Sequence, residues 1–198
     1  VTSAAFSPDG SFVITGEGCT ARVWDARSFN AWIQHDDLDG PVSHITSLDF
    51  SPDGSRLITN GSDVAHIWDA KSGSLLLDLK GHASWVTSVT FSADGLSVLT
   101  GSNDETARVW DARSGKTLLE LKGHSGRVAC VAYSPNMTRL VTCPWDEEIA
   151  HVWDARSGRL LFDLKGGARC VAFSPDGSRI LTSGRDTAAQ VWETATGK

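Results

Sequence analysis

The sequence lacks the features that mark several protein classes. No apolar run approaches the roughly 18 residues of a membrane-spanning helix, and the expected strand at residues 2–6 has no basic, apolar targeting segment ahead of it. The net charge of −6 shows none of the basic excess that a general nucleic-acid binder carries. What remains is an ordinary globular composition, with 40% apolar and 21% charged residues among 198, which is long enough for one sizeable core.

Cysteine is also scarce. Four cysteines at irregular spacing predict no disulfide framework, so we expect an intracellular chain, in the cytoplasm. Two of them, Cys130 and Cys170, hold equivalent positions in the segments Ala-Cys-Val-Ala and Arg-Cys-Val-Ala. Because a free cysteine behaves as a small hydrophobe, we interpret this pair as small, semi-buried side chains rather than as a redox pair.

What the sequence does contain is repetition. Tryptophan recurs at intervals of 44, 42, 43 and 39 residues, at Trp24, Trp68, Trp110, Trp153 and Trp192. Asp follows each of the first four, and Glu follows the fifth. The segment Phe-Ser-Pro-Asp-Gly recurs in register with the tryptophans, complete at 6–10, 50–54 and 173–177 and altered at 91–95 and 133–137. Gly-His pairs stand at 81–82 and 123–124. A fixed period near 42 residues predicts a repeat architecture.

These three markers together resemble the WD-repeat β-propeller family, and the resemblance covers nearly the whole chain. It implies an all-β fold in one domain, residues 1–198. The five repeats fall at approximately 1–38, 39–80, 81–122, 123–165 and 166–198. We expect each repeat to form a four-stranded antiparallel blade, except that the fifth lacks its outermost strand.

The pattern inside one repeat independently predicts antiparallel strands. In the third repeat, residues 85–91 alternate apolar and polar side chains, and residues 92–95 have turn chemistry. Three further strands are expected at 96–100, 106–111 and 116–121. A twisted sheet of this kind carries apolar residues on both faces, so it requires stacking against similar sheets.

The resemblance also implies a hydrogen-bonded tetrad in each blade, running from a Trp indole through a Thr hydroxyl and a His to an Asp. Repeat three has the full set at regular spacing: His82, Thr100, Asp104 and Trp110. Repeat four has it with one extra residue between Thr and Trp, where we expect a bulge: His124, Thr142, Asp146 and Trp153. The other three repeats are incomplete, with Pro41 in place of the histidine of repeat two. Each buried polar group left unpaired costs about 1–3 kcal/mol, so the complete tetrads are expected to stabilise the fold.

We expect no catalytic, cofactor or metal site. Thr, His and Asp in one network resemble a nucleophilic triad, but a catalytic set occurs once and faces a pocket, whereas this pattern repeats and includes a buried Trp. Residues 114–117, Ser-Gly-Lys-Thr, match the end of a phosphate-binding loop, yet Trp110 stands where that motif begins with Gly. The six histidines lie in different repeats without the close spacing of a zinc site.

Specificity in a repeat scaffold is expected where the units differ. The position leading into the innermost strand varies between repeats, and holds His44, Trp85, Arg127 and, across a deletion, Arg169. The position before the tight-turn Asp also varies, and holds Ser62, Asn103, Trp145 and Arg185. The resemblance places both sets at one end of the propeller, and Trp and Arg are enriched in binding hot spots. The alternative is that Trp85 and Trp145 lie flat on neighbouring loops.

The sequence therefore predicts a non-catalytic protein–protein interaction scaffold, a subunit or domain of a larger assembly. One alternative is a propeller enzyme or small-ligand binder that uses the central channel, although the expected channel residues are small and weakly ionisable: Ser47, Ser88, Cys130 and Cys170. A second alternative is an RNA-contacting propeller, whose binding would fall steeply with salt. The strand count leaves one unpaired edge, which predicts either a tight five-bladed ring or an incomplete ring whose missing strand comes from sequence or a partner outside this chain.

Overall fold

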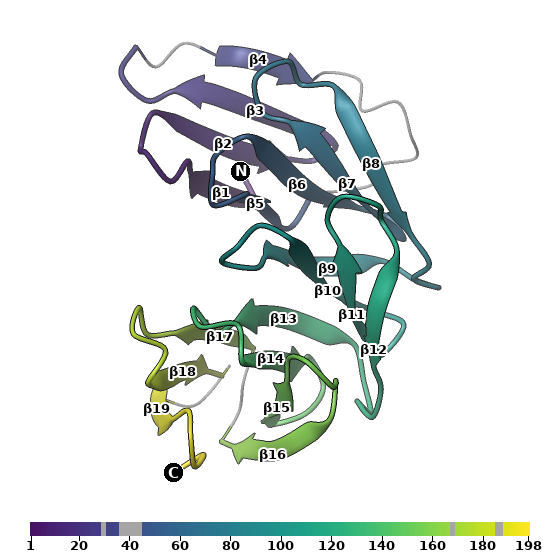
Figure 1. Cartoon of the computed structure of the whole chain (residues 1–198), viewed down its shortest axis with the longest axis vertical. Helices are drawn as coiled ribbons and strands as arrows, with labels where there is room; N and C mark the ends of the chain where they lie inside the picture. The colour runs from purple at the N-terminus through teal and green to yellow at the C-terminus, as the bar shows by residue number, and fades with distance from the viewer. Residues whose placement is uncertain (29–30, 36–44, 167–168, 185–187) are drawn as a thin grey trace.

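The computed structural model describes residues 1–28, 31–35, 45–166, 169–184 and 188–198. These residues form five antiparallel sheets, which we call blades one to five in chain order (Figure 1). In the part of the chain that the structure describes there is no helix that could cross a membrane.

The blades are built from consecutive strands. Blade one contains β1 (Ser3–Phe6), β2 (Phe12–Glu17), β3 (Thr20–Asp25) and β4 (Ala31–His35). Blade two contains β5 (Leu48–Phe50), β6 (Arg56–Gly61), β7 (Val64–Asp69) and β8 (Leu75–Lys80). Blade three contains β9 (Val86–Phe91), β10 (Ser97–Ser102), β11 (Ala107–Asp111) and β12 (Thr117–Leu121). Blade four contains β13 (Val128–Tyr133), β14 (Arg139–Pro144), β15 (Ile149–Asp154) and β16 (Leu160–Lys165). Blade five contains β17 (Cys170–Phe173), β18 (Arg179–Ser183) and β19 (Gln190–Glu193). The expected blades, including the missing outer strand of the fifth, are confirmed.

The repeated Ser-Pro-Asp-Gly segment forms the turn between the first two strands of a blade. In blade three, the Asp94 carboxylate accepts hydrogen bonds from the Ser92 hydroxyl at 2.6 Å and from the Leu96 amide at 2.9 Å. Gly95 then takes a φ of +68°, in the left-handed region that glycine adopts without strain. The same Ser-to-Asp bond recurs at Asp9, Asp53 and Asp176. This turn fixes where β10 begins and therefore the register of the pair.

The core lies between the blades rather than inside any one of them. Trp110 and Val98 of blade three pack against Ile58, Ile67 and Leu79 of blade two in one buried cluster. Equivalent clusters lie between blades one and two, three and four, and four and five. A blade therefore buries each face only when it has a neighbour on that side.

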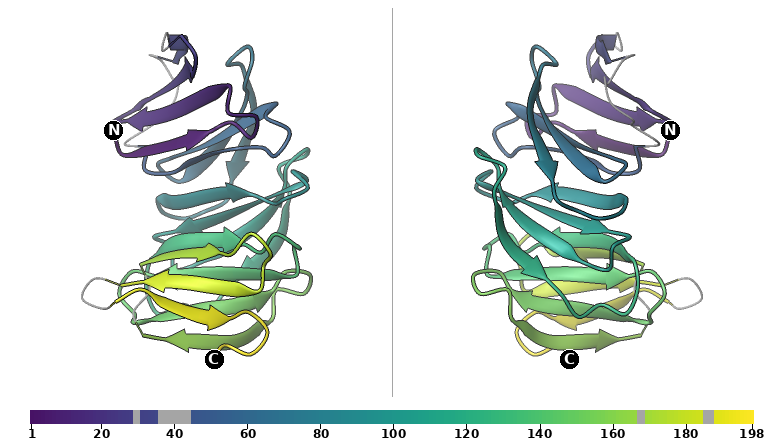
Figure 2. Two further views of the ribbon diagram at one scale, coloured as in Figure 1. Left: turned by 90° about the vertical axis from the view of Figure 1, so that its left-hand side faces the viewer. Right: turned by 90° about the vertical axis from the view of Figure 1, so that its right-hand side faces the viewer.

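The five blades form an open array, not a closed ring. Blade one and blade five stand at opposite ends of the stack (Figure 2). The tight five-bladed ring that the strand count allowed is therefore not the arrangement of this chain. The innermost strands of consecutive blades follow one side of the array in the order β1, β5, β9, β13 and β17 (Figure 1).

Candidate functional site

The tetrad of blade three is a continuous chain of hydrogen bonds. The Trp110 Nε1–H donates to the Thr100 hydroxyl oxygen at 2.8 Å, and that hydroxyl lies 2.7 Å from His82 Nε2. His82 Nδ1 lies 2.8 Å from the Asp104 carboxylate. Because a carboxylate only accepts, the imidazole proton sits on Nδ1, and Nε2 accepts the Thr100 proton. All four groups are satisfied by one another.

Burial and hydrogen bonding set the charge state of this tetrad. Burial lowers the pKa of His82, so the imidazole is neutral near pH 7. Burial also acts to raise the pKa of Asp104, but hydrogen bonds from the Thr106 hydroxyl, the Ala83 amide and His82 outweigh it and lower that pKa to about 2. A neutral histidine beside an ionised carboxylate, with the Thr100 side chain fully buried, is a structural arrangement without access for a substrate.

Blade four keeps only part of its expected tetrad. Trp153 Nε1 donates to the Thr142 hydroxyl at 2.9 Å, and that hydroxyl lies 2.7 Å from His124 Nε2. His124 Nδ1 donates to the backbone carbonyl of Glu105 at 3.0 Å, and not to Asp146. The expectation for Asp146 was therefore wrong.

Glu147, not Asp146, makes the loop contact that Asp104 makes in blade three. Its carboxylate accepts from the amide and the hydroxyl of Ser125, as Asp104 accepts from the amide of Ala83. Asp146 lies instead 3.6 Å from Arg127 Nε, with 56% of its side chain exposed. Repeat four has one more residue than repeat three between its Thr and its Trp, so the acidic residue that contacts the loop stands one position later.

The incomplete repeats retain the Trp-to-Thr bond. It is 2.8 Å from Trp24 to Thr15, 2.9 Å from Trp68 to Thr59, and 2.9 Å from Trp192 to Thr182. Pro41, which replaces the histidine of repeat two, lies outside the described residues.

In blade two an asparagine that sequence analysis missed supplies further bonds. The Asn60 carboxamide oxygen accepts from the amides of Thr46 and Ser47, and its nitrogen donates to the Val86 carbonyl of blade three. Asn60 is 1% exposed, so it links the inner strands of two blades within the core. The residue occupies the position of Gly101 in the next repeat, and that departure from the repeat was the available signal.

The variable positions of blades three and four lie in pairs at the loop end of each blade. The Asn103 amide donates to the Trp85 carbonyl at 2.8 Å, and the Trp145 amide donates to the Arg127 carbonyl at 2.6 Å. Each pair closes the loop end of its blade, opposite the Ser-Pro-Asp-Gly turns. We call this end, defined by Trp85, Asn103, Arg127, Trp145 and Arg169, the loop face. His44 and Arg185, assigned to the same surface, lie outside the described residues.

Two guanidinium groups lie over the ring of Trp145. The Cζ of Arg169, from blade five, lies 4.2 Å from the centroid of the Trp145 ring, and the Cζ of Arg127 lies 5.7 Å from it. Trp145 nevertheless exposes 45% of its surface, and Trp85 exposes 49%. The indole of Trp145 thus contacts an arginine from each of two blades, while much of it stays open to solvent.

Arg169 does not occupy the position predicted for it. It stands four residues before Phe173, as Thr87 stands four before Phe91, and Trp85 lies two residues earlier still. By the same count the residue aligned with Trp85 is at position 167, which lies outside the described residues. Arg169 reaches the loop face because blade five packs beside blade four, not because of its place in the repeat.

Cysteines meet on the inner strands of blades four and five. Cys130 is half-buried and pairs in register with the buried Cys143, while Cys170 is exposed and not semi-buried as expected. A hydrogen bond from the Cys130 thiol lowers the pKa of Cys170 to about 6, and the same bond together with burial raises the pKa of Cys130. Among the described residues, no three His, Cys, Asp or Glu side chains are grouped to hold a metal ion.

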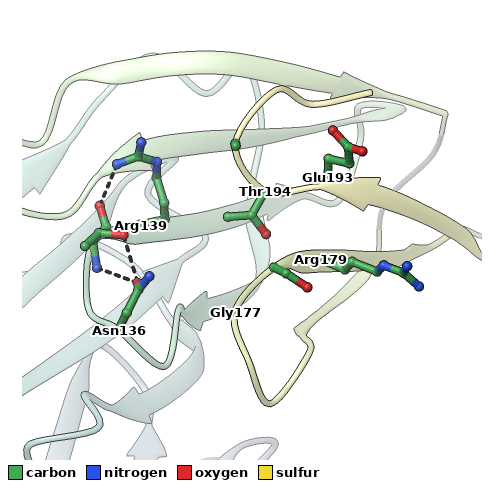
Figure 3. Close-up of a pocket in the computed structure, with 9 residues that line it drawn as sticks. Asn136, Arg139, Gly177, Arg179, Glu193 and Thr194 are labelled. Atoms are coloured by element: carbon green, nitrogen blue, oxygen red, sulfur yellow. Dashed lines mark hydrogen bonds between the residues drawn. The ribbon is translucent and has the colours of Figure 1, made fainter.

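A hollow of about 510 Å³ lies between blades four and five. Its lining includes Asn136, Arg139, Arg179 and Glu193 (Figure 3). Arg139 donates to the Thr138 carbonyl at 3.1 Å, and the side chain of Arg179 extends away from it in Figure 3. A catalytic or small-ligand site requires polar groups that converge on one point, and the charged groups of this hollow do not.

Comparison with known proteins agrees with this architecture. The family model of the WD domain, G-beta repeat, matches residues 1–25, 34–69, 73–111, 115–154 and 158–193. Each of the last three segments begins with the outermost strand of one blade and continues with the three inner strands of the next. A search among curated proteins found no match. Because the family model covers most of the sequence, the chain belongs to the WD-repeat family.

Proposed function

We propose that the chain is a non-catalytic protein-interaction scaffold, a subunit or domain of a larger assembly, and that its partner docks on the loop face. WD repeats generally mediate protein–protein interaction, and proteins built from them are typically non-enzymatic. The observation that carries the proposal is Trp145, which is half exposed and has the guanidinium groups of Arg127 and Arg169 over its ring. Free cysteines at all four positions support an intracellular, reducing compartment.

The chemistry of the loop face supports a protein partner. A tryptophan whose backbone amide is hydrogen-bonded and whose indole is stacked with cations loses little conformational freedom when a partner covers it. Trp and Arg together provide a large apolar area with charged donors at its margin, which is the composition of binding hot spots. His44 and Arg185 belong to the proposed surface by their sequence positions.

Substitution of each tryptophan tests the proposal. Trp85→Ala and Trp145→Ala are each expected to weaken partner capture by about 2 kcal/mol, roughly thirtyfold in Kd. The control is Leu96→Ala, because Leu96 is 63% exposed but follows the turn at the opposite end of blade three. Partners would be identified by cross-linking mass spectrometry in native extract and then titrated against each variant.

Unchanged capture by both tryptophan variants would place the interaction elsewhere. RNA is the second candidate partner, because Arg127 and Arg169 lie on the loop face. Salt titration separates it from a protein partner. Neutralising phosphates releases counterions, so RNA binding would fall steeply with salt, whereas docking on Trp145 is expected to change little. The same variants test the alternative of a small ligand in the channel, because binding of such a ligand would be unaffected by either tryptophan substitution.

A further inference from the structure

Every internal interface of the array joins two different faces. One face of a blade carries its Trp together with an apolar residue of the second strand and the aromatic residue that ends the first strand. In blade three these are Trp110, Val98 and Phe91, and they pack on the aliphatic residues Ile58 and Ile67 of blade two. We call the face that carries the Trp the Trp face, and the face of the preceding blade on which it packs the aliphatic face. Blades three and four meet in the same way.

The two ends of the array each leave one of these faces uncovered among the described residues. Blade one exposes its Trp face, where Phe6 is 70% exposed, although its counterpart Phe91 is 6% exposed. Blade five exposes its aliphatic face, where Leu181 is 44% and Val191 59% exposed. Their counterparts in blade three, Leu99 and Val109, are 0% and 4% exposed. The left view of Figure 2 shows the sheet of β17–β19 turned toward the viewer, with no other blade in front of it.

An arginine adds polar specificity to the same pairing. Between blades two and three, the guanidinium of Arg56 lies 5.3 Å from the centroid of the Phe91 ring. It also donates to the Gly95 carbonyl at 2.6 Å and to the Ala112 carbonyl at 3.0 Å. Stacking and two directed hydrogen bonds fix the register of one blade on the next.

Blade five and blade one carry the two halves of this arrangement. The repeat places Arg179 where Arg56 stands, and Arg179 is exposed on the aliphatic face. Blade one has Phe6, Gly10 and Ala26 at the positions of Phe91, Gly95 and Ala112. The two free faces are therefore of the two kinds that pair inside the array, and they carry matching apolar residues and hydrogen-bonding groups.

We propose that two copies of this chain associate head to tail, with the aliphatic face of blade five from one copy covering the Trp face of blade one from the other. Arg179 stacks on Phe6 of the second copy and donates to the carbonyls of its Gly10 and Ala26. The contact is heterologous, so it joins unlike surfaces and leaves a further pair of faces free until the assembly closes. It buries apolar side chains that the isolated chain leaves in water. The loop face takes no part in it.

The experiment is the mass of the chain in solution, measured by light scattering after size exclusion over micromolar to submillimolar concentration. The wild type is expected to rise from 21.2 kDa to twice that mass or more. Phe6→Glu removes one half of the contact and Leu181→Glu the other, so each variant alone is expected to remain at the mass of one chain. An equimolar mixture is expected to give a dimer and nothing larger, because one intact face of each kind remains.

Controls separate the contact from general effects on folding or solubility. Leu118→Glu introduces the same charge at a leucine that is 54% exposed on β12, away from both end faces, and is expected to associate like the wild type. Val191→Glu repeats the test on blade five, and circular dichroism checks that each variant retains its sheets. A wild type that stays monomeric overturns the proposal and leaves the end faces to other proteins or further blades. Association of either single variant to the wild-type extent also overturns it.

Discussion

The carboxylate of Glu147 accepts a hydrogen bond from the Ser125 amide at 2.7 Å, which is the position that Asp104 takes against the amide of Ala83. Burial acts to raise the pKa of Glu147, but the hydroxyl and amide of Ser125, together with the nearby His151 and His124, lower it overall. Glu147, whose side chain is 16% exposed, thus makes the contact to the loop amide, while the histidine contact expected of Asp146 goes to the Glu105 carbonyl.

We therefore expect Glu147→Ala to lower the free energy of unfolding by about 1–3 kcal/mol, because two donors on Ser125 lose their acceptor. Asp146→Ala is the matched control and is expected to cost at most about 1 kcal/mol, since an exposed ion pair contributes little. Chemical denaturation measures both. A larger loss for Asp146→Ala would contradict the assignment of Glu147.

The complete tetrad of blade three predicts a graded response to mutation. Asp104→Ala or His82→Ala is expected to destabilise the fold by about 1–3 kcal/mol, because a buried partner is left unsatisfied. Thr100→Val is expected to cost more than Thr15→Val, since Thr100 is fully buried between Trp110 and His82, whereas Thr15 is half-buried. Denaturant titration of the four variants is the measurement. Equal losses for the two threonines would contradict the role of the network.

Stability is expected to fall as the pH drops from about 6.5 to about 4. Burial lowers the pKa of His124 to about 4, from an ordinary value of 6.5. Because the unfolded chain binds the proton more readily, the neutral imidazole stabilises the fold fully above pH 6.5, and this contribution is lost as the pH falls through the folded pKa. The loss is at most about 3 kcal/mol.

Replacing His124 tests that pH dependence. His124→Gln keeps hydrogen-bonding groups without titrating, so its unfolding free energy is expected to vary less between pH 6.5 and 4 than that of the wild type. His82 also has a lowered pKa because of burial and contributes with the same sign, so some dependence remains in the variant. An unchanged pH profile would show that His124 is not held neutral by the fold.

Cys170 is expected to be the most reactive thiol of blades four and five. It is exposed and its pKa is lowered to about 6 by the Cys130 hydrogen bond, whereas Cys143 is fully buried and burial raises its pKa. Iodoacetamide at pH 7, followed by peptide mass spectrometry, is expected to label Cys170 well before Cys143. Cys130→Ala is expected to slow labelling of Cys170, because it removes the donor that lowers the pKa of Cys170. Faster labelling of Cys143 would contradict the inner-strand geometry.

Much of the fold could be predicted because its information is local in sequence. Strand, turn and strand recur within each repeat, and the Trp-to-Thr bond joins strands adjacent in the chain, as in Trp110 to Thr100. The tetrad of blade three was predicted for the same reason. On the loop face Asn103 is hydrogen-bonded to Trp85 and Trp145 to Arg127, each pair within its own blade, and the role of this face in binding stays a prediction.

The sequence by itself determined the repeat, the all-β blades and the unpaired edge of blade five, because each follows from a period that returns with turn chemistry in register. Only the tertiary structure decided which side chains complete the sites. Glu147 replaces Asp146 because an added residue changes which carboxylate can reach Ser125. Arg169 lies over Trp145 because two blades pack side by side across a deletion. The open array likewise depends on the angle between stacked sheets, which residue spacing does not encode and which arises only when side chains such as Trp110 pack on the blade before them.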